Sequence, residues 1–131
     1  MPEELDPEFI SEMEVYLIES RNTGEPSIDM SETLILDYGA KMVAGVAAYC
    51  EQLQELRLSQ CGITDEGAIA LFKELRTIQN LRVIDISYNP ITEKSLDALT
   101  GLLNANPQLV VNMRMNNIKN KFAARKMQHF E

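Results

Sequence analysis

The chain has 131 residues, of which 45% are hydrophobic and only 6% aromatic, so we expect one domain with an aliphatic core. Its formal net charge of −8 disfavours nucleic acid as a partner, and it holds no apolar run of the roughly 18 residues that a membrane span requires. Because it has two cysteines and an acidic start unlike a signal peptide, we expect a cytoplasmic protein with neither a nucleic-acid nor a membrane partner.

The first expected element is an acidic helix within residues 1–24. Asp6-Pro7-Glu8 is typical of a helix start, because proline fits the first helical turn and acids favour the positive end of the helix dipole. Gly24 is typical of a helix end. The apolar face of this helix is formed by Phe9, Ile10, Met13 and Leu17. We expect residues 1–24 to cap one end of the domain.

An apolar pattern then recurs at a step of 28 residues. Residues 53–64 and 81–92 agree at every apolar position. A step back gives a similar unit from residue 25, and a step forward gives a worn copy from residue 109 whose register slips by about one residue. The sequence therefore predicts three repeats, followed by a degenerate fourth within residues 109–131. The three repeats are residues 25–52, 53–80 and 81–108.

The second half of each unit indicates a helix. Leu96, Leu99 and Leu103 recur at helical spacing, and Thr64 or Asp65 is a typical helix start. The last expected element is a basic amphipathic helix at the end of the chain, which we expect to cap the final repeat. Its apolar side is formed by Phe122, Ala123, Met127 and Phe130, and its basic side by Lys121, Arg125 and Lys126.

The strand segments resemble the leucine-rich repeat, L-x-x-L-x-L-x-x-N/C-x-L, and the 28-residue period is similar to that of the ribonuclease-inhibitor subclass. The resemblance implies an α/β fold: a right-handed solenoid with a short parallel sheet on its concave side, helices on its convex side and helical caps at both ends. It also implies that Thr33, Cys61 and Asn89 satisfy the buried turn after each strand through their side chains. Cys61 is then a small buried residue and not a nucleophile.

The concave face carries the candidate binding residues. The middle residue of each L-x-L motif points toward this face, which gives a column of alternating charge: Asp29, Arg57, Asp85 and Arg114. Two interpretations stay open, a recognition stripe for a partner or a ladder of charges that pair with one another. Tyr88 is either an aromatic anchor or a cover for the turn. The full set of candidate partner-binding residues is Asp29, Glu55, Arg57, Gln60, Val83, Asp85, Tyr88 and Arg114.

The sequence predicts a protein that is not an enzyme. Its single histidine, His129, lies at the end of the chain, where no frame would hold a Ser-His-Asp or Cys-His device. One histidine with Cys50 and Cys61 gives no four-ligand metal set, and no phosphate-binding glycine motif occurs. We therefore expect no catalytic residue, no metal and no cofactor.

The repeat predicts a non-catalytic interaction module: an adaptor, an inhibitor or an assembly factor that binds a partner protein through the concave strands and adjoining turns. One alternative is a cytoskeletal role, because repeats of this subclass with a capping helix are similar to those of tropomodulin-type actin-end proteins. Another is head-to-tail self-assembly, because the first 20 residues are acidic and the last 18 are basic. Apart from such weak self-association, we expect a monomer.

Overall fold

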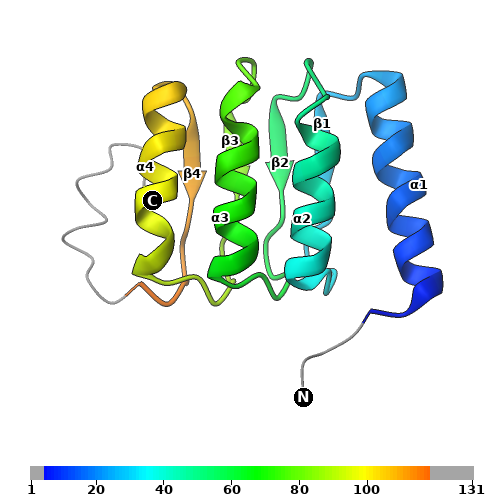
Figure 1. The fold of residues 1–131 in the computed structure, drawn as a ribbon, viewed down its shortest axis with the longest axis horizontal. Helices are drawn as coiled ribbons and strands as arrows, with labels where there is room; N and C mark the ends of the chain where they lie inside the picture. The colour runs from blue at the N-terminus through cyan, green and yellow to red at the C-terminus, as the bar shows by residue number, and fades with distance from the viewer. Residues whose placement is uncertain (1–4, 119–131) are drawn as a thin grey trace.

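The computed structural model describes residues 5–118 and arranges them in two layers. Four short parallel strands form one sheet in the order β1-β2-β3-β4, and helices α2, α3 and α4 lie side by side along one face of it (Figure 1). This is the α/β repeat fold that the sequence pattern predicts. The expected C-terminal capping helix, together with His129, falls on residues 119–131, outside the described part of the chain.

Strands and helices alternate along the chain after the first helix. Each strand has three residues, and each of the first three is followed by a helix that leads back to the start of the next strand. In chain order, the elements are α1 (Pro7–Thr23), β1 (Ser27–Asp29), α2 (Leu36–Ala47), β2 (Glu55–Arg57), α3 (Asp65–Glu74), η1 (Leu75–Thr77), β3 (Val83–Asp85), η2 (Glu93–Ser95), α4 (Leu96–Ala105) and β4 (Val110–Asn112).

The strands pair in a register that follows the repeat, except in the last unit. Ile28 lies beside Leu56, and Leu56 lies beside Ile84, at the predicted step of 28 residues. Ile84 lies beside Val111, which is a step of 27, and Asp85 lies beside Asn112. The prediction that Arg114 stands in the central column of the strand face is therefore wrong, because Asn112 occupies that place.

Burial explains why the last strand takes this register. A central Arg114 would turn Met113 and Met115 toward the core. In the structure, Val111 and Met113 are 1% exposed and continue the buried columns of the earlier strands, whereas Met115 is 65% exposed. Val111 suits the position because a β-branched side chain packs well on a pleated surface.

A single aliphatic core runs between the sheet and the helices. The inward residues of the two central strands, Leu56 and Ile84, are fully buried, as are Leu58 and Ile86 just after the strand ends. Within residues 5–118, Phe72 of α3 is the largest fully buried side chain. Complete burial of one leucine or isoleucine side chain contributes roughly 1.5–3 kcal/mol relative to leaving it exposed. Because each repeat shares this core with its neighbours, a repeat alone could not bury its apolar side.

One side chain per repeat holds the turn that follows each strand. Asn89 is 1% exposed, and its amide oxygen accepts hydrogen bonds from the backbone N–H groups of Cys61, at 2.9 Å, and Ile63, at 3.0 Å. Its amide nitrogen donates to the carbonyl oxygens of Leu58, Ile86 and Ser87. Buried backbone groups need such partners, so the predicted role of Asn89 is confirmed.

Cys61 and Thr33 take the same place in the two earlier repeats. The Cys61 thiol is fully buried and donates to the carbonyl oxygen of Met30 at 3.2 Å. Burial raises the pKa of Cys61 to about 11, so the thiol stays protonated at neutral pH and is a donor, not a nucleophile. The Thr33 hydroxyl donates to the carbonyl oxygen of Ser31 at 3.4 Å.

Helix α1 packs beside the first strand and begins where the sequence predicts. The Asp6 carboxylate accepts a hydrogen bond from the Glu8 N–H at 2.9 Å, and Gly24 ends the helix with φ +69°. The Tyr16 hydroxyl accepts from the N–H of Asp29 at 3.1 Å, and it also lies 3.4 Å from the carbonyl oxygen of Asp29. This tyrosine therefore covers the free edge of β1, a contact that the sequence analysis missed.

Within residues 5–118, no helix is long and apolar enough to cross a bilayer.

Aspartates link the starts of α2 and α3 to the repeat that follows each of them. The Asp37 carboxylate accepts hydrogen bonds from the Thr64 N–H at 2.8 Å, from the Thr64 hydroxyl at 2.5 Å and from the Gly67 N–H at 3.1 Å. A β-carbon at Gly67 would stand 2.5 Å from that carboxylate, so glycine allows the contact. Thr64 is the N-cap of α3, as expected, but its hydroxyl bonds to Asp37 instead of its own helix.

The same link recurs 28 residues later at Asp65. Its carboxylate accepts hydrogen bonds from the Thr92 N–H at 2.9 Å, the Thr92 hydroxyl at 2.6 Å and the Ser95 hydroxyl at 2.5 Å. Burial by itself would raise the pKa of Asp65. The hydrogen bonds from Ser95 and Thr92 outweigh that effect and hold the pKa below its ordinary value of 3.8.

Asp65 therefore predicts a specific loss of stability in acid. Because its pKa is lower in the folded than in the unfolded chain, its stabilisation is complete well above the unfolded-state pKa of 3.8 and disappears as the pH falls through the folded-state pKa. We expect the free energy of unfolding, measured by urea titration from about pH 2 to about pH 6, to fall less steeply in acid for Asp65→Asn than for the wild type. An identical pH profile for both proteins would show that this carboxylate carries no such linkage, and the exposed Asp97→Asn provides the matched control.

Candidate functional site

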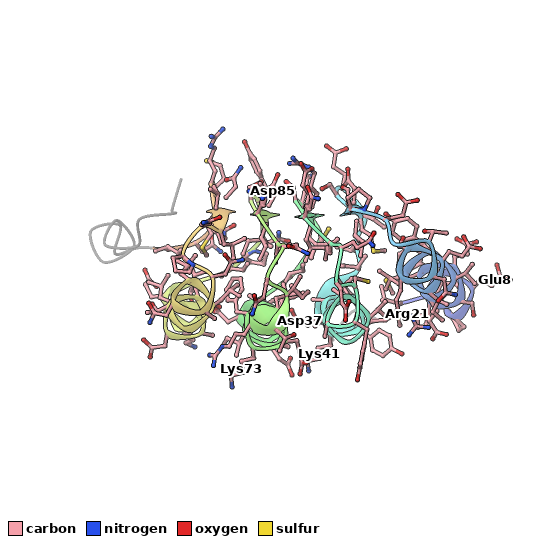
Figure 2. The ribbon with its side chains drawn as sticks, turned by 90° about the horizontal axis from the view of Figure 1, so that it is seen from above. Glu8, Arg21, Asp37, Lys41, Lys73 and Asp85 are labelled. Atoms are coloured by element: carbon pink, nitrogen blue, oxygen red, sulfur yellow. The ribbon has the colours of Figure 1, made fainter. Side chains whose placement is uncertain are left out.

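The strand face is the side of the sheet that turns away from the helices. Figure 2 shows Asp85 on this side, whereas Lys41 and Lys73 lie on the helix side. Two columns of outward residues cross the strands on this face. The first column is Ser27, Glu55, Val83 and Val110, and the second is Asp29, Arg57, Asp85 and Asn112.

Arg57 pairs with acids on its own strand and on the next. Its guanidinium lies 3.2 Å from the Glu55 carboxylate and 4.0 Å from the Asp85 carboxylate. The Asp85 carboxylate also accepts hydrogen bonds from the N–H and hydroxyl of Ser87. In the middle of the face, the charges therefore satisfy one another, which favours the charge-ladder interpretation there. Half-exposed pairs of this kind contribute at most about 1 kcal/mol each, so they orient side chains more than they stabilise the fold.

The turns after the strands form a second row of exposed side chains. This turn row consists of Glu32, Gln60, Tyr88 and Met115, all with φ between +55° and +61°. Left-handed backbone is uncommon for residues other than glycine, and at the first three of these positions a hydrogen bond to the next repeat holds it. The N–H of Tyr88, for example, donates to the carbonyl oxygen of Arg114 at 2.9 Å. The geometry fixes the Tyr88 side chain at the surface, where it is 54% exposed.

The strand face and the turn row change character from the first repeat to the last. The first half carries the acids Asp29, Glu32 and Glu55. The second half carries two apolar pairs, Val83 with Val110 on the strands and Tyr88 with Met115 on the turn row. Arg82 precedes β3 and Arg114 follows β4, and both are exposed. The surface is therefore acidic at one end and apolar with basic residues at the other.

The predicted site residues are thus brought onto one side of the molecule. Asp29, Glu55, Arg57, Val83 and Asp85 lie on the strand face, and Gln60 and Tyr88 lie in the turn row. Arg114 is the exception to its predicted place. Its N–H donates to the side-chain oxygen of Asn112 at 2.9 Å, so it follows the last strand as Ser87 follows β3.

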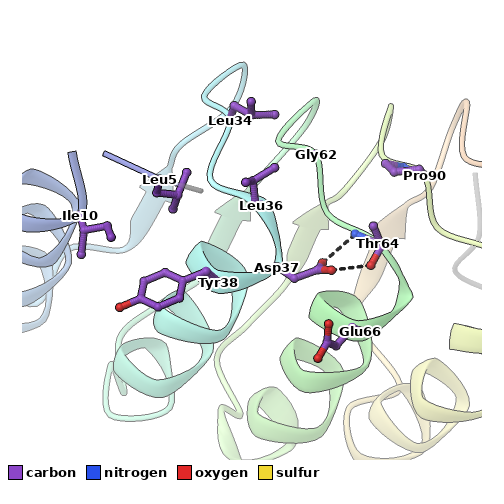
Figure 3. A pocket seen from close by; sticks show the side chains of 10 residues that line it. All are labelled: Leu5, Ile10, Leu34, Leu36, Asp37, Tyr38, Gly62, Thr64, Glu66 and Pro90. Carbon is purple, nitrogen blue, oxygen red and sulfur yellow. Dashed lines mark hydrogen bonds between the residues drawn. The ribbon is translucent and has the colours of Figure 1, made fainter. Parts of the chain in front are cut away.

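A groove that the sequence analysis missed lies next to the turn row. It encloses about 780 Å³ beside the first turns of α1, α2 and α3 (Figure 3). Its apolar lining includes Leu5, Ile10, Leu34, Leu36 and Tyr38, and its acidic lining is Asp37 and Glu66. We call it the loop groove. A volume of this size matches that of small-molecule and peptide pockets.

Gly62 shapes the loop groove. Its φ is +72°, and a β-carbon there would stand 2.6 Å from Leu34 Cδ1 and 3.0 Å from Leu36 Cδ2. Glycine thus lets two leucines of one repeat lie over the turn of the next. In the sequence, Leu34, Gly62 and Pro90 share one position at the 28-residue step. This correspondence does not reveal that the side chain of Leu34 is exposed, so it could not predict the groove. Leu34 is 53% exposed and Tyr38 is 55% exposed.

Metal-binding side chains do not gather in residues 5–118. In this part of the chain, no three His, Cys, Asp or Glu side chains form a group that could hold a metal ion. Cys50 is a buried free thiol, and burial raises its pKa.

Comparison with known proteins identifies the repeat. Residues 49–72 match one model of the leucine-rich repeat, and residues 80–102 match another. These segments contain β2 with most of α3, and β3 with most of α4. These two segments are similar to leucine-rich repeats. Domains of this kind generally bind proteins.

Two vertebrate relatives share only a segment with this chain. It is 44% identical over 64 residues to the "Centrosomal protein of 78 kDa" of Mus musculus, and 41% identical over 66 residues to that of Xenopus tropicalis. These alignments cover 49% and 50% of this chain but only 8% and 9% of the relatives. The chain thus corresponds to a small part of these longer proteins.

A solved structure shares the fold. The structure titled "Leiomodin-1 Actin-Binding Site 2 (ABS2)" matches with a TM-score of 0.73, over 85% of this chain and 68% of that one. The sequence identity is 14%, so this likeness supports the strand–helix architecture and not a shared partner.

Proposed function

We propose that the chain is a non-catalytic module that binds a partner protein over the strand face, the turn row and the loop groove. The observation that carries this proposal is the concentration of exposed apolar side chains along one edge of the solenoid. Leu34, Tyr38, Tyr88 and Met115 are 53%, 55%, 54% and 65% exposed, and all lie in or near the turns that follow the strands. Exposed apolar surface of this kind is typical of interaction sites.

The predicted polar residues frame this surface. Arg57 and Asp85 offer a paired guanidinium and carboxylate whose positions are fixed before a partner arrives. Glu55, Gln60 and Val83 lie around them, and Asp29 and Arg114 occupy the two ends. We expect Tyr88 to contribute most of the affinity, since tyrosine is enriched among the residues that dominate interfaces.

The organisation of the chain is part of the proposal. We propose residues 1–24 as a cap, residues 25–108 as three repeats of the ribonuclease-inhibitor-like subclass, and residues 109–131 as a fourth, degenerate repeat with a basic cap. The 28-residue strand spacing, with a helix after each of the first three strands, supports this division.

We propose a cytoplasmic location, with the centrosome as the first place to look. The support is the similarity to a segment of the centrosomal protein of 78 kDa. A fluorescent fusion of the full chain, imaged with a centrosome marker, tests this directly. Diffuse signal without enrichment at the marker would remove the centrosome from the proposal and leave the binding surface untouched.

A photo-cross-linker placed at single positions tests the binding surface. With the cross-linker at position 88, we expect covalent capture of a specific partner in cells. At position 73, on the helix side, we expect no capture of that partner. A Tyr38→Ala/Tyr88→Ala variant should lose at least about tenfold in affinity for the captured protein. Tyr49→Ala, which replaces an even more exposed tyrosine elsewhere, should not. Equal capture from positions 73 and 88 would contradict the proposed surface.

Actin is the second candidate partner. Its support is the fold that the chain shares with the leiomodin structure whose title names an actin-binding site. Co-sedimentation of the full chain with filamentous actin, and an elongation assay at the pointed end, test it. No co-sedimentation and unchanged elongation would exclude actin and leave other proteins as partners.

A further inference from the structure

Two exposed surfaces at opposite ends of the solenoid complement each other. One is the outer stripe of α1, which presents Val15, 54% exposed, and Ile18, 40% exposed. These residues are three apart on a helix and therefore lie next to each other on its surface. They face away from the core, which α1 contacts instead through Met13 and Leu17.

The second surface is the far end of the turn row. Tyr88 and Met115 occupy corresponding positions in neighbouring repeats and stand 54% and 65% exposed. The hydrogen bond from the Tyr88 N–H to the carbonyl oxygen of Arg114 holds the two turns together. Along the same two strands lies the second apolar pair, Val83 with Val110. We call these four residues the receptor surface.

The charges of the two surfaces are opposite. Helix α1 carries four acids and one base, Arg21; the acids are Glu8, Glu12, Glu14 and Glu19. Exposed arginines flank the receptor surface, with Arg82 before β3 and Arg114 after β4, and the nearby acid Asp85 is already paired with Arg57. The loop groove, by contrast, has no arginine or lysine in its lining. Its acids are Asp37 and Glu66, and Glu66 is already paired with Lys41 at 2.8 Å, so the groove offers an acidic helix less complementary charge.

We propose that the receptor surface binds an acidic amphipathic helix, and that α1 of a second copy of this chain is its occupant. Val15 and Ile18 of one copy pack against Tyr88 and Met115 of the other, while the acids of α1 face Arg82 and Arg114. The proposal rests on the proposed function in that it assigns a partner to part of the same binding surface.

The contact joins two different surfaces, so a pair of copies still has one free α1 stripe and one free receptor surface. Such a heterologous contact extends into an open chain or a ring instead of stopping at a symmetric dimer. A single helix on a narrow surface belongs to the small, weak class of interfaces. Mass should therefore rise with protein concentration and fall with salt, because charge attraction across the contact is screened.

Sedimentation equilibrium of the full chain tests the association. In about 0.02 M salt, we expect the weight-average mass to rise above 14.8 kDa as concentration increases, and to return toward that value in about 0.5 M salt. The double variant Val15→Glu/Ile18→Glu removes the apolar stripe of α1 and keeps the helix acidic. Tyr88→Asn/Met115→Asn removes the receptor, and asparagine tolerates the left-handed backbone at both positions.

Each double variant alone should stay at 14.8 kDa, with an association constant at least about tenfold below the wild type. An equimolar mixture of the two variants should form a dimer and nothing larger. One variant keeps an intact α1 stripe, and the other keeps an intact receptor surface. Tyr49→Ala is the control and should associate like the wild type. A wild-type mass of 14.8 kDa at every concentration and salt, or a mixture that stays monomeric, overturns the proposal. In that case, capture of another protein from position 88 would still support the proposed function.

Discussion

Replacing Asn89 with alanine is expected to lower the free energy of unfolding by on the order of 4 kcal/mol, because each buried polar group left without a partner costs about 1–3 kcal/mol. The Asn89 side chain makes five hydrogen bonds to backbone groups in two repeats and is 1% exposed. A loss of this size is a large part of the 5–15 kcal/mol that typically holds a domain folded.

Urea unfolding followed by circular dichroism measures this loss. Asn104→Ala, at an exposed position of α4, is the matched control and should change the unfolding free energy by no more than about 0.5 kcal/mol. Similar stabilities for the two variants would mean that Asn89 does not hold the turns between the strands.

Replacing Phe72 with alanine should cost a similar amount, about 4 kcal/mol, because it removes the largest buried side chain and leaves a cavity. The surroundings cannot easily close this space. The residue 28 positions earlier is Ala44, itself buried, so the neighbouring repeat supplies only a methyl group at the equivalent place.

Thermal and urea unfolding of Phe72→Ala, Phe72→Leu and Tyr49→Ala separate the contributions. Phe72→Leu retains much of the volume and should lose less than half as much stability as Phe72→Ala. Tyr49 is 73% exposed, so its replacement should change the unfolding free energy by no more than about 0.5 kcal/mol. Because the core is continuous, we expect one cooperative transition, and a second transition in the wild type would indicate repeats that unfold separately.

The first three strands could be predicted because each one needs the same inward residues. Ile28, Leu56 and Ile84 fill one buried column, and the 28-residue step follows directly from that requirement. The buried place of Asn89 was also predictable, since its amide matches the groups that a turn leaves unpaired.

The last strand could not be placed from the period alone. The spacing from Leu109 to Val111 is one residue shorter than the spacing from Leu81 to Ile84. In the structure, Val111 enters the core and Met115 stays outside. The alternation of Leu109, Val111 and Met113 was the signal that could have corrected the assignment of Arg114.

The loop groove depended on backbone conformations that composition does not reveal. Leu36 has φ +60°, a conformation uncommon for leucine, and its N–H donates to the carbonyl oxygen of Cys61 in the next repeat. A contact between repeats thus determines where Leu36 points. The same holds for Asp37 and Asp65, whose carboxylates act on the following repeat and not on their own helices.

Methyl–methyl nuclear Overhauser effects across the strands test most directly whether the repeats stack around one shared core. In the full chain with labelled Ile, Leu and Val methyl groups, we expect cross-peaks from Leu56 to both Ile28 and Ile84, and from Ile84 to Val111, as the strand register requires. Absence of the Leu56 cross-peaks to both neighbours would contradict the stacked arrangement, and with it the surfaces proposed to bind.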